Sequence, residues 1–123
     1  MNEYKDERFH IKLDDGIVYV IFHKAYIDYN FVNDLILRRL EITKDIAYPM
    51  FSDFRAAKSG PREARQRMAE KDAGIGVKAV AILINSNVQR VIYNFFNNIY
   101  RAPAPARLFT SKEKALKWLQ QYK

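Results

Sequence analysis

One short stretch of the chain brings a hydroxyl group together with several basic side chains. Ser59 is followed directly by Gly60 and Pro61, and an arginine-rich run begins just beyond them. A helix that starts here offers free backbone amides and the positive end of its dipole, which attract phosphates and carboxylates. The alternative is an ordinary solvated basic helix, because arginine is a good helix former. The candidate anion-binding or partner-docking site comprises Asp53, Arg55, Lys58, Ser59, Gly60, Arg62 and Arg65.

The residue types that bind metals or act as nucleophiles are isolated or absent. His10 and His23 each stand alone on or beside a predicted strand, without the His-x-x-x-His or carboxylate spacing of a metal site. Cysteine is absent from the chain, which excludes disulfides, thiolate nucleophiles and cysteine-ligated metals. The sequence therefore predicts no bound metal and no cofactor.

The carboxylates and glycines also fit structural roles. Asp14 and Asp15 fit a turn, and Asp53 fits the end of a strand. The one close pair of glycines, Gly74 and Gly76, precedes a predicted strand, whereas a phosphate-binding glycine loop follows one. We therefore predict that the protein is not an enzyme.

A second set of candidate residues is aromatic and lies on or near two predicted helices. Core packing is the default explanation, because aromatic stripes at helical spacing bury large areas in small domains. Two further hypotheses remain open, a homodimer face and an apolar ligand pocket of the lipid-transfer kind. A wide pocket would consume much of the core of so short a chain. The candidate residues are Tyr29, Phe31, Tyr93, Phe95, Phe96 and Tyr100.

Length and charge limit the class of protein. A chain of 123 residues fits one domain. Its net charge of +7 would attract any polyanion, and Lys58, Arg62 and Arg65 could contact phosphates. No helix-turn-helix, ribonucleoprotein motif or zinc spacing is present, so we do not expect nucleic acid as a partner. The longest apolar run, 79–84, is too short to span a membrane, and the start of the chain is polar. We predict a cytoplasmic protein without a transmembrane segment.

The N-terminal elements are expected to begin with a hairpin. Strands over 8–13 and 17–22 flank an Asp-Asp-Gly turn, and Asp-Gly supplies the positive φ angles of tight turns. Alternation in the first strand is typical of a half-buried edge strand. Residues 1–7 are expected to form a poorly ordered extension, and the domain itself to span 8–123.

Two helices and a strand are predicted next. Apolar spacing favours a helix from Asp28 to about Thr43, capped by Asp28 or Asn30, with Arg38 and Arg39 mostly on the polar face. An aromatic strand covers 47–54. A second helix begins at Pro61, with Ser59 or Gly60 as its cap, and ends at Gly74.

The C-terminal half contains the strongest packing patterns. The run 77–84 is typical of a strand covered on both faces. A capping box at Ser86 and Gln89 predicts an amphipathic helix over about 88–99, followed by a proline-stiffened connector. A short strand over 107–109 and a capping box at Thr110 and Glu113 lead into a terminal helix. Its inward residues are expected to be Ala115, Leu116, Leu119 and Tyr122.

The predicted order is β-β-α-β-α-β-α-β-α. Strands that alternate with helices at these lengths imply an α/β domain. We expect a mixed, mostly parallel sheet with an N-terminal β-hairpin and helices packed on it.

The order and three local sequences resemble the STAS domain, and more closely its SpoIIAA-like branch, which is similar in fold to CRAL-TRIO lipid-transfer domains. The resemblance covers about 8–121. Its most specific parts are the apolar strand 78–84, the helix with Phe95 and Phe96, and the segments Pro105–Thr110 and Glu113–Leu119. Small bacterial proteins of that branch end in a very similar strand, Phe-Thr turn and Ala-x-x-Trp-Leu helix. These are packing motifs, and they carry no activity.

The resemblance implies a non-enzymatic regulatory or protein-interaction module in a bacterium, acting as a homodimer on a protein partner. In anti-sigma factor antagonists of the STAS family, a serine at the start of the helix after the third strand is phosphorylated. Ser59 lies roughly at that position, so it is the candidate phosphorylation site. Lys58 and Pro61 depart from the family pattern, in which an acidic residue precedes the serine. The alternative function is binding of an apolar or lipid-like ligand in a CRAL-TRIO-like pocket.

Overall fold

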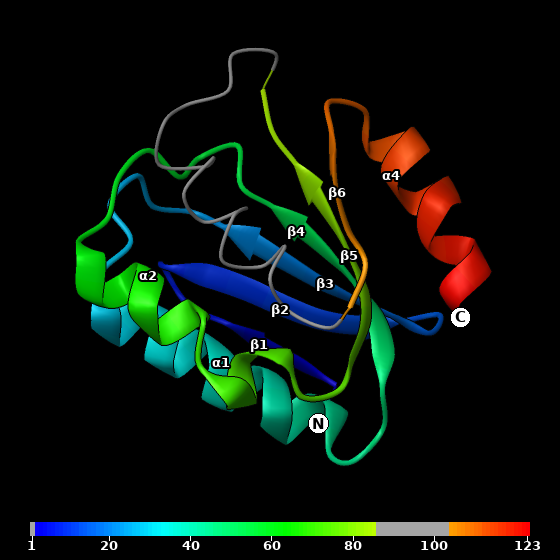
Figure 1. The fold of residues 1–123 in the computed structure, drawn as a ribbon, viewed down its shortest axis with the longest axis horizontal. Coiled ribbons are helices and arrows are strands. Elements are labelled where there is room, and N and C mark those ends of the chain that lie inside the picture. The colour runs from blue at the N-terminus through cyan, green and yellow to red at the C-terminus, as the bar shows by residue number, and fades with distance from the viewer. Residues whose placement is uncertain (1, 86–103) are drawn as a thin grey trace.

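The structure is a computed structural model that describes residues 2–85 and 104–123. Within these residues, six strands form one sheet in the order β1-β2-β3-β4-β5-β6. Figure 1 shows α1 and α2 on one face of the sheet and α4 on the other. The strands are β1 Glu3–Lys5, β2 Phe9–Asp14, β3 Ile17–Phe22, β4 Tyr48–Asp53, β5 Val77–Leu83 and β6 Ala106–Phe109. The helices are α1 Tyr29–Thr43, α2 Arg62–Met68 and α4 Lys112–Leu119, with short 3-10 helices η1 Lys71–Gly74 and η2 Gln120–Tyr122.

The predicted mixed sheet with an N-terminal hairpin is confirmed. β2 and β3 pair in antiparallel register around Asp15 and Gly16, which have φ angles of 49° and 76°. The positive angles are those that a tight two-residue turn requires, and glycine adopts them without strain. From β3 to β6 each neighbouring pair is parallel. The crossovers between them place α1 on one face of the sheet.

The expectation of a poorly ordered N-terminal extension is wrong for residues 3–5. They form β1, which pairs antiparallel with β2, so β1 and not β2 is the edge strand. The ring of Tyr4 packs against Phe9 at a centroid distance of 5.7 Å, and the guanidinium of Arg38 lies over the Tyr4 ring. Backbone pairing and these ring contacts order a segment whose polar sequence gave little sign of structure.

Capping explains where α1 starts. The Asp28 carboxylate accepts a hydrogen bond from the backbone amide of Phe31 over 2.8 Å. Of the two predicted caps, Asp28 is therefore correct. At the other two helices the predicted caps are wrong. Pro61 itself is the N-cap of α2, and Ser111 rather than Thr110 caps α4 by accepting from the Lys114 amide.

The helix after β4 is also shorter than predicted. α2 ends at Met68 and the chain continues into η1, which ends at Gly74. This break places the segment 69–75 across the same face of the sheet as α1. The predicted capping box at Ser86 and Gln89, the helix over 88–99 and the first part of the connector lie outside the described residues.

Two apolar clusters form the core, one on each face of the sheet. Alternation along the strands divides them, since Val80 and Ile82 of β5 face α1 while Ala79, Ala81 and Leu83 face α4. Ala115 and Leu119 of α4 are fully buried in the second cluster. Leu116 and Tyr122, also expected inward, pack at its margin together with Trp118.

Candidate functional site

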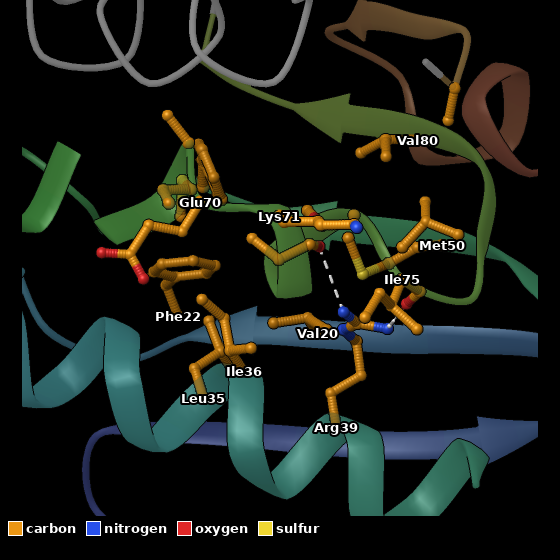
Figure 2. A pocket seen from close by; sticks show the side chains of 18 residues that line it. Val20, Phe22, Leu35, Ile36, Arg39, Met50, Glu70, Lys71, Ile75 and Val80 are labelled. Carbon is orange, nitrogen blue, oxygen red and sulfur yellow. Dashed lines mark hydrogen bonds between the residues drawn. The ribbon is translucent and has the colours of Figure 1, made fainter. Parts of the chain in front are cut away.

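An apolar pocket of about 500 Å³ lies on the α1 face of the sheet. Its floor is built from strand residues that point toward α1 and from Phe54, which directly follows β4, and one wall is the segment 69–75 between α2 and β5. Figure 2 shows side chains from the sheet, from α1 and from this segment around one space. The floor residues are Val20, Phe22, Met50, Ser52, Phe54 and Val80.

Helical periodicity explains the contribution of α1. Leu35, Ile36 and Arg39 follow one another at one- and three-residue steps, so they share the face of the helix that lies against the sheet. Leu35 and Ile36 are apolar, but Arg39 brings a guanidinium group into the same apolar surroundings. The prediction that Arg39 lies on the polar face of α1 is therefore wrong.

Arg39 is only 3 % exposed, and main-chain carbonyl groups hold its guanidinium. Its Nη1 donates to the carbonyl of Ile75 over 2.8 Å, and its Nη2 donates to those of Ala73 and Asp72 over 3.1 and 3.4 Å. Burial lowers the pKa of Arg39 to about 10, and the negative charge of Asp72 only partly opposes this effect.

A second buried arginine holds the same wall from the other side. Arg67 is 4 % exposed; its Nη1 and Nη2 donate to the two carboxylate oxygens of Asp72, and its Nε donates to Asn33. The paired hydrogen bonds from Arg67 lower the pKa of Asp72. Glu70 also lies 3.2 Å from the Arg67 guanidinium. The pocket wall is thus fixed by side chains from both α1 and α2.

The predicted anion site around Ser59 lies at a corner of the molecule, away from the pocket lining. Ser59 is exposed, and its backbone amide donates to the Ala25 carbonyl while its own carbonyl accepts from Ile27. An isolated parallel bridge joins it to Tyr26. The Ser59 backbone is therefore fixed while its side chain faces solvent.

The basic residues predicted at this corner do not form one group. The Arg55 guanidinium makes two hydrogen bonds to the Asp53 carboxylate, so these residues neutralise each other. Arg65 donates to the Gly60 carbonyl over 3.1 Å. Lys58 and Arg62 are exposed. Of the predicted set, Lys58, Ser59 and Arg62 are exposed, and Arg55 is exposed while paired with Asp53.

The predicted aromatic set divides between surface and core. Tyr29 is 44 % exposed at the start of α1, whereas Phe31 is buried between the rings of Phe9 and Phe22. Neither lines the pocket. Phe31 packs in the core because it points toward the sheet. The other members, Tyr93, Phe95, Phe96 and Tyr100, lie outside the described residues.

Sequence reasoning missed the pocket arginine, although a signal existed. Arg39 is four residues after Leu35 and three after Ile36, which is the spacing of the buried face. The sequence predicts one helix through Gly74, so it does not indicate that Met68 and segment 69–75 form a wall of the pocket. Ser52, a buried hydroxyl in the floor of the pocket, was not singled out either.

Other polar groups offer no additional centre in the described part of the chain. His10 is hydrogen-bonded to Glu3 across β1 and β2, and His23 is exposed. Residues 2–85 and 104–123 contain no cluster of three or more His, Cys, Asp and Glu side chains arranged to hold a metal ion. Among the same residues, no helix has the length and apolar character needed to cross a membrane.

Comparison with solved structures shows the fold. The chain is similar to an uncharacterized protein from the DUF3478 family of Shewanella loihica PV-4, whose crystal structure has a SpoIIAA-like fold. The TM-score is 0.64 at 18 % sequence identity, over 90 % of this chain and 91 % of that one. The resemblance to the STAS domain and its SpoIIAA-like branch is thereby confirmed at the level of the fold.

Comparisons of sequence give a family without an assigned activity. No curated protein matches the chain. Residues 11–123 match the family described as "Domain of unknown function (DUF7793)". This match includes every element from β3 to the terminal helix, and most of β2. The chain belongs to the DUF7793 family.

Proposed function

We propose that this protein binds a small apolar compound in the pocket between α1 and the sheet, without catalysing a reaction on it. The observation that carries the proposal is the pocket itself. Its volume of about 500 Å³ lies within the range of small-molecule sites, which is roughly 300–1,000 Å³. Its lining is mainly apolar, with few polar groups among the described residues. That combination is typical of sites that hold a ligand by burial and orient it by a few polar contacts.

The rigidity of the walls supports this function. Protein interiors are normally packed as densely as organic crystals, so an open volume inside a small domain forfeits many dispersion contacts. Arg39 and Arg67 hold the segment 69–75 away from the sheet through five contacts of 2.7–3.4 Å. A bound apolar compound would supply the missing contacts. This is the ligand-binding alternative that the sequence left open, and it needs no catalytic group.

Native mass spectrometry of the freshly purified protein tests the proposal. A ligand taken up from the host cell appears as a mass additional to the chain, which disappears after extraction with organic solvent. Adding hexadecan-1-ol, a neutral apolar probe, to the extracted protein should restore a bound species and raise the midpoint of thermal unfolding. A clean chain mass, with neither binding nor stabilisation by the probe, would refute the function.

A second candidate function is docking of a protein partner at the corner around Ser59. The observation that favours it is an exposed aromatic pair, since Tyr26 is 58 % exposed and Tyr29 44 % exposed, beside the exposed cations Lys58 and Arg62. Aromatic and arginine side chains are enriched in protein interfaces. Phosphorylation of Ser59 would add negative charge next to Lys58 and Tyr26. The regulatory role, and a homodimer as the working form, are proposed on this basis.

A further inference from the structure

The pocket contains the guanidinium group of Arg39. A purely apolar ligand would give this charged group no partner. The guanidinium lines the pocket, yet its partners are the carbonyl groups of Asp72, Ala73 and Ile75. In residues 2–85 and 104–123, no carboxylate lies within 4.0 Å of it. A buried charge that is held only by carbonyl dipoles is incompletely compensated.

The hydrogen-bonding capacity of Arg39 is also incompletely used by the described residues. A guanidinium has five N–H groups in a fixed planar fork. The three contacts of Arg39 involve Nη1 and Nη2, so at most three of the five groups are occupied by them. Burial lowers the pKa of Arg39 to about 10, which is the effect expected where the charged form lacks water and a carboxylate partner. An anion in the pocket would provide both charge and acceptors.

Lys71 adds a second cation to the lining of the pocket. In Figure 2, the nitrogen atoms of Arg39 and Lys71 lie toward the same end of the pocket, beside Met50 and Ile75. The one acidic residue that lines the pocket within the described part of the chain, Glu70, is ion-paired with Arg67, and Figure 2 shows its carboxylate turned away from that end. One end of an otherwise apolar space is therefore positively charged.

We propose that the ligand is an apolar compound with one carboxylate group, which Arg39 and Lys71 bind while the sheet residues contact its apolar body. The inference rests on the proposed ligand-binding function and names the chemical class of the ligand. A carboxylate is planar and matches the fork of a guanidinium, and charge-assisted bonds of this kind are about twice as strong as neutral ones. One carboxylate also suffices to compensate the positive charge of Arg39.

The test compares palmitate with hexadecan-1-ol, which have apolar chains of equal length and differ in the head group. Solvent-extracted full-length protein is titrated with each probe at pH 8, where a carboxyl group is ionised. The wild-type protein should bind palmitate at least about tenfold more tightly than the alcohol. Lys71→Met should weaken palmitate binding about tenfold and leave alcohol binding within about twofold. Arg39→Met should also weaken palmitate binding at least about tenfold, but it removes hydrogen bonds of the pocket wall as well, so alcohol binding is compared only for Lys71→Met. Lys78→Met removes an exposed lysine outside the pocket lining and serves as the matched control.

The outcomes separate this inference from the function on which it rests. Equal binding of acid and alcohol by the wild-type protein overturns the carboxylate assignment and leaves ligand binding intact. Binding of neither probe overturns the proposed function and the inference with it. If Lys71→Met and Lys78→Met weaken palmitate binding equally, palmitate is attracted to the basic surface in general. This result also overturns the carboxylate assignment. If Arg39→Met does not fold, the wild-type preference and Lys71→Met decide, because Lys71 is exposed and can be replaced without disturbing the core.

Discussion

Arg67 and Asp72 form a two-point ion pair, in which Nη1 donates to Oδ1 over 2.7 Å and Nη2 donates to Oδ2 over 2.9 Å. The pair joins the end of α2 to the 3-10 helix η1. From α1, the guanidinium of Arg39 donates hydrogen bonds to the main-chain carbonyl groups of the same segment. Two buried arginines from different helices thus fix one wall of the pocket. The shape of the pocket depends on polar contacts as much as on apolar packing.

Removing Arg67 should destabilise the fold. Arg67→Met leaves the Asp72 carboxylate and the Asn33 amide oxygen without their donor, so we expect the free energy of unfolding to fall by about 1–3 kcal/mol. Arg62→Met, in the same helix at an exposed position, should change it by no more than about 0.5 kcal/mol. Chemical denaturation of both variants measures the difference. Equal stabilities would mean that the ion pair contributes nothing to holding the wall.

Filling the pocket should abolish ligand binding without unfolding the protein. Val80 is in the floor, and Val80→Phe places a ring in the open volume. We expect binding of hexadecan-1-ol to fall at least about tenfold, while thermal unfolding remains cooperative. Lys78→Phe introduces the same ring at an exposed position near the start of the same strand, outside the pocket lining, and should leave binding unchanged. If Val80→Phe binds the probe as well as Lys78→Phe does, the ligand lies elsewhere.

Acid should lower the free energy of unfolding, partly by protonating the Asp72 carboxylate. Arg67 holds the pKa of Asp72 below its ordinary value of 3.8, so the folded state prefers the ionised carboxylate more strongly than the unfolded state does. This contribution to stability is complete above about pH 4 and is lost as the pH falls through the lowered pKa. Asp72→Asn should therefore be less stable than wild type at pH 7, with a smaller difference at pH 3. Denaturation at both values measures this, and a difference independent of pH would contradict the assignment.

The start of α1 should depend on Asp28. Asp28→Ala removes the acceptor of the Phe31 amide hydrogen bond, and loss of such a cap costs about 1 kcal/mol. Asn30→Ala, in the first turn of the helix, should cost less than about 0.5 kcal/mol, because Asp28 already satisfies the amide. The midpoints of thermal unfolding of the two variants show whether Asp28 or Asn30 caps the helix. A larger loss for Asn30→Ala would be the contrary result.

Ser59→Asp separates a regulatory role from a structural one. The hydrogen bonds of Ser59 to Ala25 and Ile27 are made by its backbone, so the substitution should change stability by less than about 0.5 kcal/mol. If the corner is a docking site controlled by phosphorylation, Ser59→Asp should reduce recovery of a cross-linked partner at least about fivefold, while Ser59→Ala retains it. Identical cross-linking patterns for Ser59→Asp, Ser59→Ala and wild type would count against the switch.

Local sequence determined most of the fold. The hairpin at Asp15 and Gly16, the cap at Asp28 and the burial of β5 on both faces were predictable, because each depends on a few neighbouring residues. The exact ends of α2 and α4 were not, since neighbouring residues offered competing caps.

Tertiary structure alone decided the candidate site. The Ile75 carbonyl that accepts from Arg39 is 36 residues away in the chain, and the Asn33 oxygen that accepts from Arg67 is 34 residues away. The spacing of Arg39 from Leu35 and Ile36 indicates the buried face of α1, but no local pattern shows that an arginine on that face finds hydrogen-bond partners so far along the chain. The chain sequence specified that α1 buries one face against the sheet. The positive charge of Arg39 lies inside an apolar pocket only because the distant segment 69–75 packs over that face. The carbonyl groups of this segment accept the hydrogen bonds of the guanidinium, which would otherwise stay in water.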